Sequence, residues 1–356
     1  MDRRGNSRLV QSADPGRLKM AEAARARSKI LLVSLGGTIT MTSGAGSGIV
    51  PTLTGADLVR AVPALADVAE IEAVSPFRLP GPSLTLANLR EVARLLNQRL
   101  AGDIAGAIVV QGTDTIEETA FVLDLLVGGD KPVVVTGAMR GAEAPGADGP
   151  ANLLASAIVA GSQAARRLGT LVVLNDTIHA ARFVQKASTF LPSTFTSFSG
   201  GPLGCVIEGT ARIDVRVERR ATIRNGCEGS DQPVALLTAA LGDDGRLLTG
   251  LPGLGYRGLV VEAMGVGHVP SAMVPGLASL AEVFPVVLSS RVASGSVFAG
   301  TYGFPGSEID LLGRGLIGAG SLGGLKARLL LSLLLGVGFQ GQRLREEFTQ
   351  VVSPQI

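Results

Sequence analysis

Apolar runs recur along the chain, and glycine-rich or polar turns follow them. The first run extends from Ile30 to Leu35 and leads directly into Gly36-Gly37-Thr38. Runs of the same character cover residues 107–110, 132–135 and 170–174. Short continuous apolar runs bounded by turn residues are typical of parallel strands buried on both faces. We therefore predict four such strands in the first half of the chain.

Helical patterns separate these predicted strands. They cover residues 86–99, 115–126 and 149–160, and the second places Ile116, Ala120 and Leu123 on one face. Strands that alternate with helices of this length predict βαβ units, and hence a mostly parallel sheet with right-handed crossovers. A later apolar run, 328–339, is shorter than the roughly 20 residues that a membrane span needs, so it predicts a buried helix.

The pattern changes over residues 203–231, which predict a hairpin region and a linker. A second unit follows, with predicted strands at 259–262 and 286–288 and a closing helix that begins near Leu325. The predicted fold is α/β: a larger N-terminal domain with a mostly parallel, flavodoxin-like sheet and a smaller C-terminal α/β domain. The predicted segments are a disordered tail at 1–28, domains at 29–215 and 235–356, and a linker at 216–234.

Composition limits the classes of function. The 356 residues suffice for two domains, and 46% hydrophobic against 17% charged residues indicates a globular protein. A net charge of +2, no Trp and two Tyr argue against a nucleic-acid-binding surface. Cys205 and Cys227 provide neither a disulfide framework nor metal-ligand spacing, and the sequence does not decide whether they pair. The Arg-rich first 28 residues lack the apolar core of a secretory signal, so a cytoplasmic location is expected.

Three polar loops follow predicted strands, at 36–39, 111–115 and 136–140. In an open parallel sheet, ligands bind beside the loops at the carboxyl ends of the strands, so we expect the three loops to form one cleft. A structural alternative remains for each loop. Gly36-Gly37 has the composition of a simple turn, and Asp114 has the spacing of a helix N-cap with Glu117 completing a capping box.

Several common catalytic and nucleotide-binding motifs are absent. The loop at 36–39 has neither dinucleotide-binding nor P-loop spacing, and the G-x-G-x-x-G pattern at 253–258 precedes a predicted strand instead of following one. No G-x-S-x-G occurs. The two histidines, His179 and His268, are too few for a strong metal site. Threonine chemistry remains, and a threonine hydroxyl needs a base or a charge to become nucleophilic.

A series of short motifs occurs in a fixed order along the chain. They are Leu35-Gly36-Gly37-Thr38-Ile39, Gly112-Thr113-Asp114-Thr115-Ile116-Glu117-Glu118-Thr119, Gly137-Ala138-Met139-Arg140, Ala147-Asp148-Gly149-Pro150-Ala151-Asn152-Leu153, Leu174-Asn175-Asp176, Ser289-Ser290-Arg291-Val292 and Lys326-Ala327-Arg328. With these motifs the sequence closely resembles the bacterial L-asparaginase/glutaminase family of Thr-dependent amidohydrolases. The resemblance extends from about Lys29 to the C-terminus.

The resemblance implies a set of catalytic residues. Thr38 matches the residue that attacks the side-chain amide and forms an acyl-enzyme, and Thr113, Asp114 and Lys186 match a second Thr-Asp-Lys cluster. A partly desolvated lysine can lose its proton and act as a base toward Thr113. On sequence alone, Lys186 has the alternative of a solvated surface charge. No metal or cofactor is implied.

The resemblance also implies substrate contacts. Asp114 accepts the α-ammonium group of the substrate, and the backbone amides of Thr113 and Ala138 receive the developing oxyanion. Gly37 and Gly112 match further substrate-binding positions. Either the Ser83 side chain or the backbone at Gly81 binds the substrate carboxylate.

The chain departs from the family pattern at the loop after Thr38. Ile49 stands where the family has a tyrosine that contacts the nucleophile, although residues 42–48 retain the Ser/Gly composition of a flexible lid. His268 and Glu308 align with residues that the family inserts into the active site of a neighbouring subunit, which implies a tetramer assembled from tight dimers. Tyr302, close to Glu308 in sequence, is a candidate activator in trans, with packing at a subunit interface as its alternative.

The resemblance therefore implies a cytoplasmic L-asparaginase that hydrolyses L-asparagine to L-aspartate and ammonia and binds neither nucleic acid nor membrane. The alternatives are a broader glutaminase-asparaginase, an asparagine-binding regulatory protein with weak activity, and an amidotransferase subunit that supplies ammonia to a tRNA-bound substrate. One methylene in a pocket discriminates by only about 1–3 kcal/mol, so the sequence does not decide between asparagine and glutamine. The third alternative predicts an added RNA-contacting domain, for which 28 residues are too few.

Overall fold

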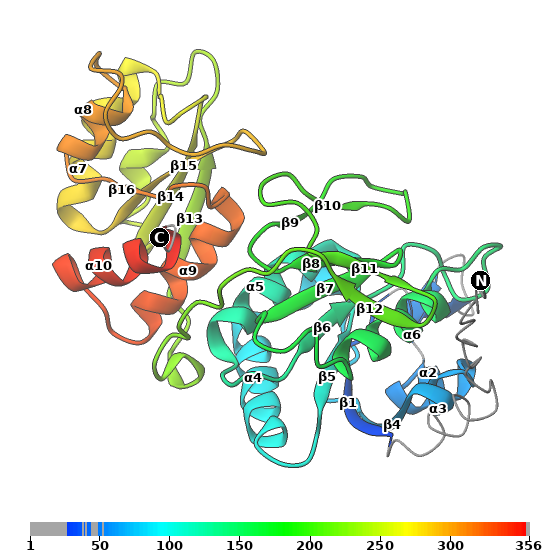
Figure 1. The fold of residues 1–356 in the computed structure, drawn as a ribbon. Helices are drawn as coiled ribbons and strands as arrows, with labels where there is room; N and C mark the ends of the chain where they lie inside the picture. The colour runs from blue at the N-terminus through cyan, green and yellow to red at the C-terminus, as the bar shows by residue number, and fades with distance from the viewer. Residues whose placement is uncertain (1–26, 38, 40, 44–48, 52, 354–356) are drawn as a thin grey trace, which may run out of the picture.

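The computed structural model describes residues 27–37, 39, 41–43, 49–51 and 53–353. These residues form two α/β units in series (Figure 1). The strands of the first unit are β1 (Ser28–Ser34), β2 (Met41–Ser43), β3 (Ile49–Pro51), β4 (Ala69–Val74), β5 (Gly106–Val110), β6 (Val133–Thr136), β7 (Thr170–Leu174), β8 (Thr177–Ala180), β9 (Val184–Lys186), β10 (Phe195–Ser197), β11 (Gly204–Ile207) and β12 (Thr210–Ile213). Its helices are α2 (Gly55–Ala61), α3 (Leu65–Val68), α4 (Leu86–Leu100), α5 (Ile116–Leu126) and α6 (Gly149–Ala160), with 3₁₀ turns η2 (Gly81–Ser83) and η3 (Thr113–Thr115).

The large sheet of the first unit is mixed. Its strand order is β12-β11-β8-β7-β6-β5-β1-β4. Five neighbouring strands, β4, β1, β5, β6 and β7, are parallel. If these five are counted 1 to 5 along the chain, their order across the sheet is 2-1-3-4-5, which is the flavodoxin-like arrangement. The strands β8, β11 and β12 extend one edge in antiparallel fashion. The predicted α/β fold is therefore confirmed, with an antiparallel edge that the apolar runs did not indicate.

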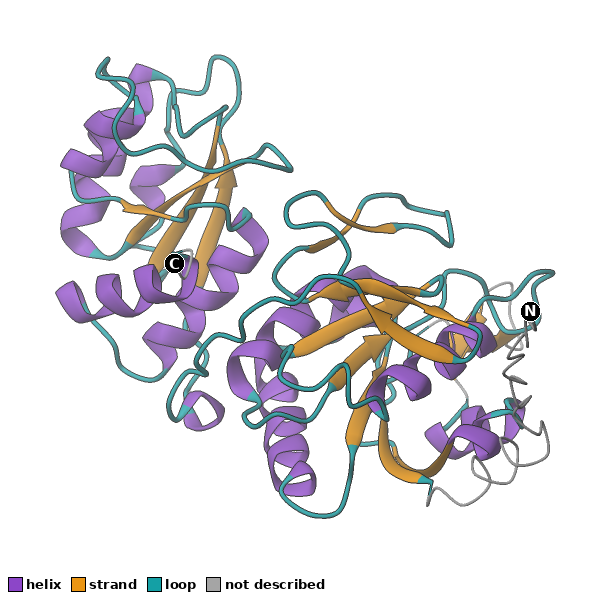
Figure 2. Ribbon diagram, viewed as in Figure 1, coloured by secondary structure: helices purple, strands orange, loops and turns teal. Residues whose placement is uncertain are grey.

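The second unit is a smaller parallel sheet between helices (Figure 2). Its strands lie in the order β13 (Val234–Thr238), β14 (Gly258–Ala263), β15 (Val286–Ser290) and β16 (Ile317–Gly318). Its helices are α7 (Val274–Val283), α8 (Glu308–Gly313), α9 (Gly324–Gly336) and α10 (Gly341–Val352), and 3₁₀ turns lie at η4 (Gly226–Glu228) before the sheet, η5 (Leu248–Gly250) and η6 (Ser271–Met273).

Helix α9 belongs to the cores of both units. Its apolar side chains, including Leu330 and Leu334, pack in one cluster with Val260 of β14 and with Leu123 of α5. The predicted buried helix is thus present, and it packs on α5 on one side and on the small sheet on the other. Since α9 completes both cores, it fixes the second unit against the face of the first that α4 and α5 cover (Figure 1).

Two further observations complete the outline of the fold. Cys205 and Cys227 are both free thiols. Among the helices that the structure describes, none has the length and apolar character required to traverse a lipid bilayer.

Candidate active site

The candidate site lies at the carboxyl ends of β1, β5 and β6. Strand β1 is flanked by β4 and β5, and the chain order of the parallel strands reverses here, which is where open α/β sheets bind ligands. The loops after the three strands meet as expected. The backbone N–H of Leu35 donates to Val110 O at 2.8 Å, and that of Gln111 donates to Thr136 O at 3.1 Å.

The first two loops touch through glycine backbone. Gly37 has a φ of +90°, which side chains rarely adopt, and a Cβ added there would lie 1.9 Å from the backbone N of Gly112. Gly112 in turn lies against Gly81 of η2, and Gly137 lies against the carbonyl of Gln111. These glycines are therefore required by direct contact between loops, which is more than the simple turn that Gly36-Gly37 alone suggests.

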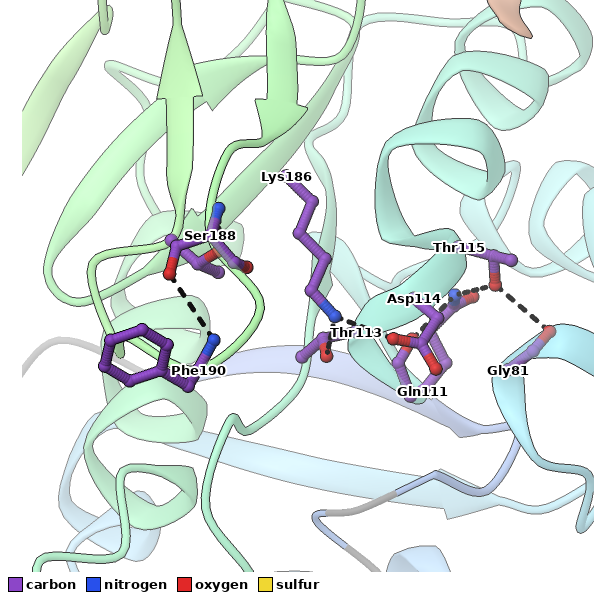
Figure 3. Close-up of polar contacts among 10 residues, drawn as sticks. Gly81, Gln111, Thr113, Asp114, Thr115, Lys186, Ser188 and Phe190 are labelled. Atoms are coloured by element: carbon purple, nitrogen blue, oxygen red, sulfur yellow. Dashed lines mark hydrogen bonds and ion pairs between the residues drawn. The ribbon is translucent and has the colours of Figure 1, made fainter.

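Side chains from the same loops fix η2 beside β5. Thr115 Oγ1 donates to the carbonyl of Gly81 at 3.2 Å and accepts from Gln111 Nε2 at 3.1 Å (Figure 3). Gln111 is fully buried. Gly81 is consequently held with its backbone at the site, whereas the Ser83 residue at the end of the turn is exposed.

Lys186 brings Thr113 and Asp114 into one cluster from more than 70 residues away in the sequence. Its Nζ lies 3.0 Å from Thr113 Oγ1 and 2.7 Å from Asp114 Oδ1 (Figure 3). The side chain of Lys186 is 17% exposed and that of Asp114 is 60% exposed. Lys186 is therefore not a solvated surface charge. Asp114 is not a helix cap either, because α5 has Thr115 at its N-cap with no side-chain capping bond.

This arrangement defines what the cluster can do. An amine in hydrogen-bond contact with a hydroxyl can accept the hydroxyl proton when neutral and return it as an ammonium, without further movement. The exposed carboxylate of Asp114 keeps surface free for a second cation, so it can accept an ammonium group from a ligand while it pairs with Lys186.

The loop after β6 is held by two residues for which the sequence motif gave no role. The carboxylate of Asp148 accepts from the backbone N–H groups of Met139 and Arg140 at 3.0 and 2.9 Å. Asn152 Nδ2 donates to the carbonyl of Gly137 at 3.0 Å, and its Oδ1 accepts from the N–H of Asn175 at 2.8 Å. These bonds orient the backbone around Ala138, which is buried. In the sequence, both residues belong to the matching motif at 147–153, and Asp148 directly precedes the helix predicted at 149–160, but neither observation indicated these contacts.

The residue expected to be the nucleophile is not among those described. Thr38 lies outside the described residues, as do residues 44–48 of the expected lid. The residues on either side of Thr38 are described: Gly37 contacts Gly112, and Ile39 is buried against Gly149. Residues 41–43 form β2, which pairs antiparallel with β3, the strand that begins at Ile49.

His268, Tyr302 and Glu308 form a separate cluster in the second unit. Within the described chain, Glu308 is held by residues of its own unit, and its expected contribution to the site of a neighbouring subunit stays a prediction. The Glu308 side chain is 0% exposed, its Oε1 accepts from the N–H groups of Thr301 and Tyr302 at 2.9 and 2.7 Å, and its Oε2 lies 3.3 Å from His268 Nε2. Burial alone would raise the pKa of Glu308, but the hydrogen bonds outweigh burial and lower it.

The aromatic rings of this cluster remain partly exposed. The Tyr302 ring packs edge-on against His268 with centroids 4.9 Å apart, and Phe304 does so at 5.0 Å. His268 is one-quarter exposed. The other histidine, His179, is buried beside Ser197, and burial lowers its pKa to about 4, so it is a neutral structural residue. The described residues contain no cluster of His, Cys, Asp or Glu that could hold a metal ion.

Comparison with known proteins gives one consistent result. A family model described as asparaginase, N-terminal, matches residues 29–220, and one described as glutaminase/asparaginase C-terminal domain matches residues 233–348. A probable L-asparaginase of Deinococcus radiodurans is 37% identical over 91% of this chain and 98% of its own. A glutaminase-asparaginase of Acinetobacter glutaminasificans is 31% identical over 87% and 95%. The crystal structure of a probable cytoplasmic L-asparaginase from Campylobacter jejuni superposes with a TM-score of 0.83 at 30% identity, covering 91% of this chain and 100% of that one.

Proposed function

Since this chain belongs to the asparaginase family, in both its N-terminal and its C-terminal domain, we propose that it is a cytoplasmic L-asparaginase that hydrolyses L-asparagine to L-aspartate and ammonia. The observation that carries this proposal is the Thr113–Lys186–Asp114 cluster beside the contact of Gly37 with Gly112. A hydroxyl, an amine and an exposed carboxylate there match the needs of an amide substrate that also carries an α-ammonium group.

The proposed reaction proceeds through an ester on Thr38. The Thr38 hydroxyl adds to the side-chain amide carbon, and the oxyanion that forms accepts hydrogen bonds from the backbone N–H groups of Thr113 and Ala138. Collapse of this intermediate breaks the C–N bond, and the leaving nitrogen takes a proton and departs as ammonia. Water then adds to the ester carbon, the bond to Thr38 breaks, and aspartate leaves with the hydroxyl restored.

The Thr113–Lys186 pair is proposed to move the protons. Neutral Lys186 takes the proton of Thr113 across the 3.0 Å contact, and Thr113 in turn takes a proton at the reacting centre. Asp114 holds the amine in place and pairs with the substrate α-ammonium. Gly37, Gly112 and Gly81, which pack backbone against backbone, are proposed to present that backbone to the substrate. Ser83 is exposed at the end of the η2 turn and remains a candidate contact for the substrate carboxylate.

Steady-state kinetics on asparagine and glutamine side by side test the proposal. We expect kcat/KM for asparagine to exceed that for glutamine by at least about tenfold, the usual effect of one methylene in a fitted pocket. Equal values would favour a glutaminase-asparaginase, which the same cluster also supports. Binding of asparagine without ammonia release would instead indicate a regulatory protein.

We also propose that the active form is a homo-oligomer, a tetramer assembled from dimers. The second unit exposes the apolar side chains of Val292 and Phe298 as well as Tyr302 and Phe304, which pack on His268. Such a group of exposed apolar residues is typical of an interface. Activation of Thr38 by the Tyr302 hydroxyl in trans stays a prediction that depends on this assembly.

Sedimentation velocity at the assay concentration tests the assembly. We expect the active species to sediment as a tetramer. Dilution to concentrations at which the tetramer dissociates should lower turnover in proportion to the tetramer lost. A monomer with full turnover would contradict the proposal.

A further inference from the structure

The strand that carries Lys186 has little support from the large sheet. Strand β9 has three residues, and among the described strands it pairs only with β10, in a two-stranded sheet separate from the eight-stranded one (Figure 1). A short isolated hairpin is marginally stable by itself. Other contacts must therefore determine where Lys186 lies relative to Thr113.

Lys326 of helix α9 supplies two of these contacts from the second unit. Its Nζ donates to the carbonyl of Val184 at 2.6 Å and to the carbonyl of Arg182 at 3.2 Å. Val184 is the first residue of β9 and stands two positions before Lys186. The Lys326 side chain thus holds the strand by its backbone, independently of the side chains on it.

Lys326 is placed for this contact at an energetic cost. The residue is 4% exposed, and burial lowers the pKa of its ammonium to about 8, although Glu117, Asp124 and Glu118 act in the opposite direction. A buried lysine without partners is strongly unfavourable, so its two carbonyl bonds account for its presence. A neutral amine still has N–H groups to donate, so the contact does not depend on the charge.

Glu117, in the first turn of α5, shares the surroundings of Lys326. Burial raises the pKa of its carboxyl, and the charge of Lys326 acts in the opposite direction. The hydrogen bonds that reach the start of β9 from α9 are those of Lys326.

We propose that Lys326 is a positioning residue for Lys186. From the C-terminal domain, its Nζ binds the backbone carbonyls of Arg182 and Val184 and so fixes β9 where the Lys186 amine contacts Thr113. This inference rests on the proposed function, because it assumes that Lys186 serves turnover. Displacement of a reacting group by about 1 Å can cost 10²-fold in rate, so loss of the anchor affects kcat directly.

Lys326→Met tests the proposal, because methionine retains an unbranched apolar stem and removes the donors. We expect kcat for asparagine to fall at least about tenfold while KM changes less than about threefold. Ser332→Ala is the matched control: Ser332 is also a buried residue of α9 whose side chain donates to a backbone carbonyl, that of Gln232, but it does not contact β9. We expect that variant to keep wild-type kinetics.

A double-mutant cycle separates positioning from a general loss of folded protein. If Lys326 acts through Lys186, Lys326→Met has less than about a twofold effect on the residual activity of Lys186→Met. Independent effects that multiply would overturn the proposal. If Lys326→Met does not fold, Lys326→Gln, which keeps an N–H₂ donor, takes its place in the cycle, with a smaller loss of kcat expected.

Hydrogen exchange gives a readout that does not require turnover. We expect the backbone amides of residues 182–188 to exchange faster in Lys326→Met than in Ser332→Ala. The amides of helix α9 should exchange at the same rate in both variants. Unchanged exchange in residues 182–188 would overturn the proposal even if activity fell. A wild-type protein that does not hydrolyse asparagine would refute the proposed function instead, and the exchange measurement would still decide whether Lys326 anchors the strand.

Discussion

Replacement of Thr38 by alanine is expected to reduce asparagine hydrolysis at least about 10³-fold. The substitution removes the hydroxyl that forms the ester, and the remaining groups of the site cannot replace a covalent intermediate. The fold should be retained, because only a hydroxyl and a methyl group are lost. Ammonia release under saturating asparagine measures the effect, and mass spectrometry of rapidly quenched enzyme should detect an aspartyl adduct in the wild type alone.

Thr38→Ser provides the control for this experiment. It preserves the hydroxyl and removes only the methyl group, so it should retain far more activity than Thr38→Ala. Thermal denaturation establishes that both variants are folded. Activity of Thr38→Ala within about tenfold of the wild type would remove Thr38 from the role of nucleophile.

Lys186→Met is expected to reduce kcat by about 10²-fold or more. The variant keeps a stem of similar length but leaves Thr113 Oγ1 and Asp114 Oδ1 without the amine that now lies 3.0 and 2.7 Å from them. Loss of a positioned proton-transfer group typically has an effect of this size. The pH dependence of kcat should change as well, because a group proposed to transfer protons is removed.

Lys131→Met is the matched control for Lys186→Met. Lys131 also donates from Nζ to an oxygen, the carbonyl of Gly102 at 2.6 Å, but it does so on the exposed surface. Its loss should leave kcat and the pH profile unchanged. Equal behaviour of the two variants would assign Lys186 to the same class of surface charge.

The parts of the fold that the sequence predicted are those with strong local signals. Strand β7 and helix α6 have the predicted limits, because a continuous apolar run and a Gly-Pro start define their ends. The hairpin of β9 and β10 was not predicted. Its strands have three residues each, and long-range contacts such as those of Lys326 determine their position.

The candidate site divides in the same way. The convergence of the three loops follows from strand order, which periodicity predicts in outline. The association of Lys186 with Asp114 came from the family resemblance, since no local pattern joins residues that far apart. The intrachain contacts of Glu308 were not predicted, because a sequence does not reveal that backbone N–H groups six and seven residues earlier donate to its carboxylate.

The shared core around helix α9 has a consequence for synthesis of the protein on the ribosome. Residues 324–336 emerge after most of the chain, yet their leucines complete the packing over α5 near the start. Until they appear, the nascent N-terminal domain presents an uncovered apolar face to solvent, the kind of surface that favours aggregation or chaperone binding. A stop codon directly before this helix would therefore release an insoluble fragment, even though the whole first domain had already been translated.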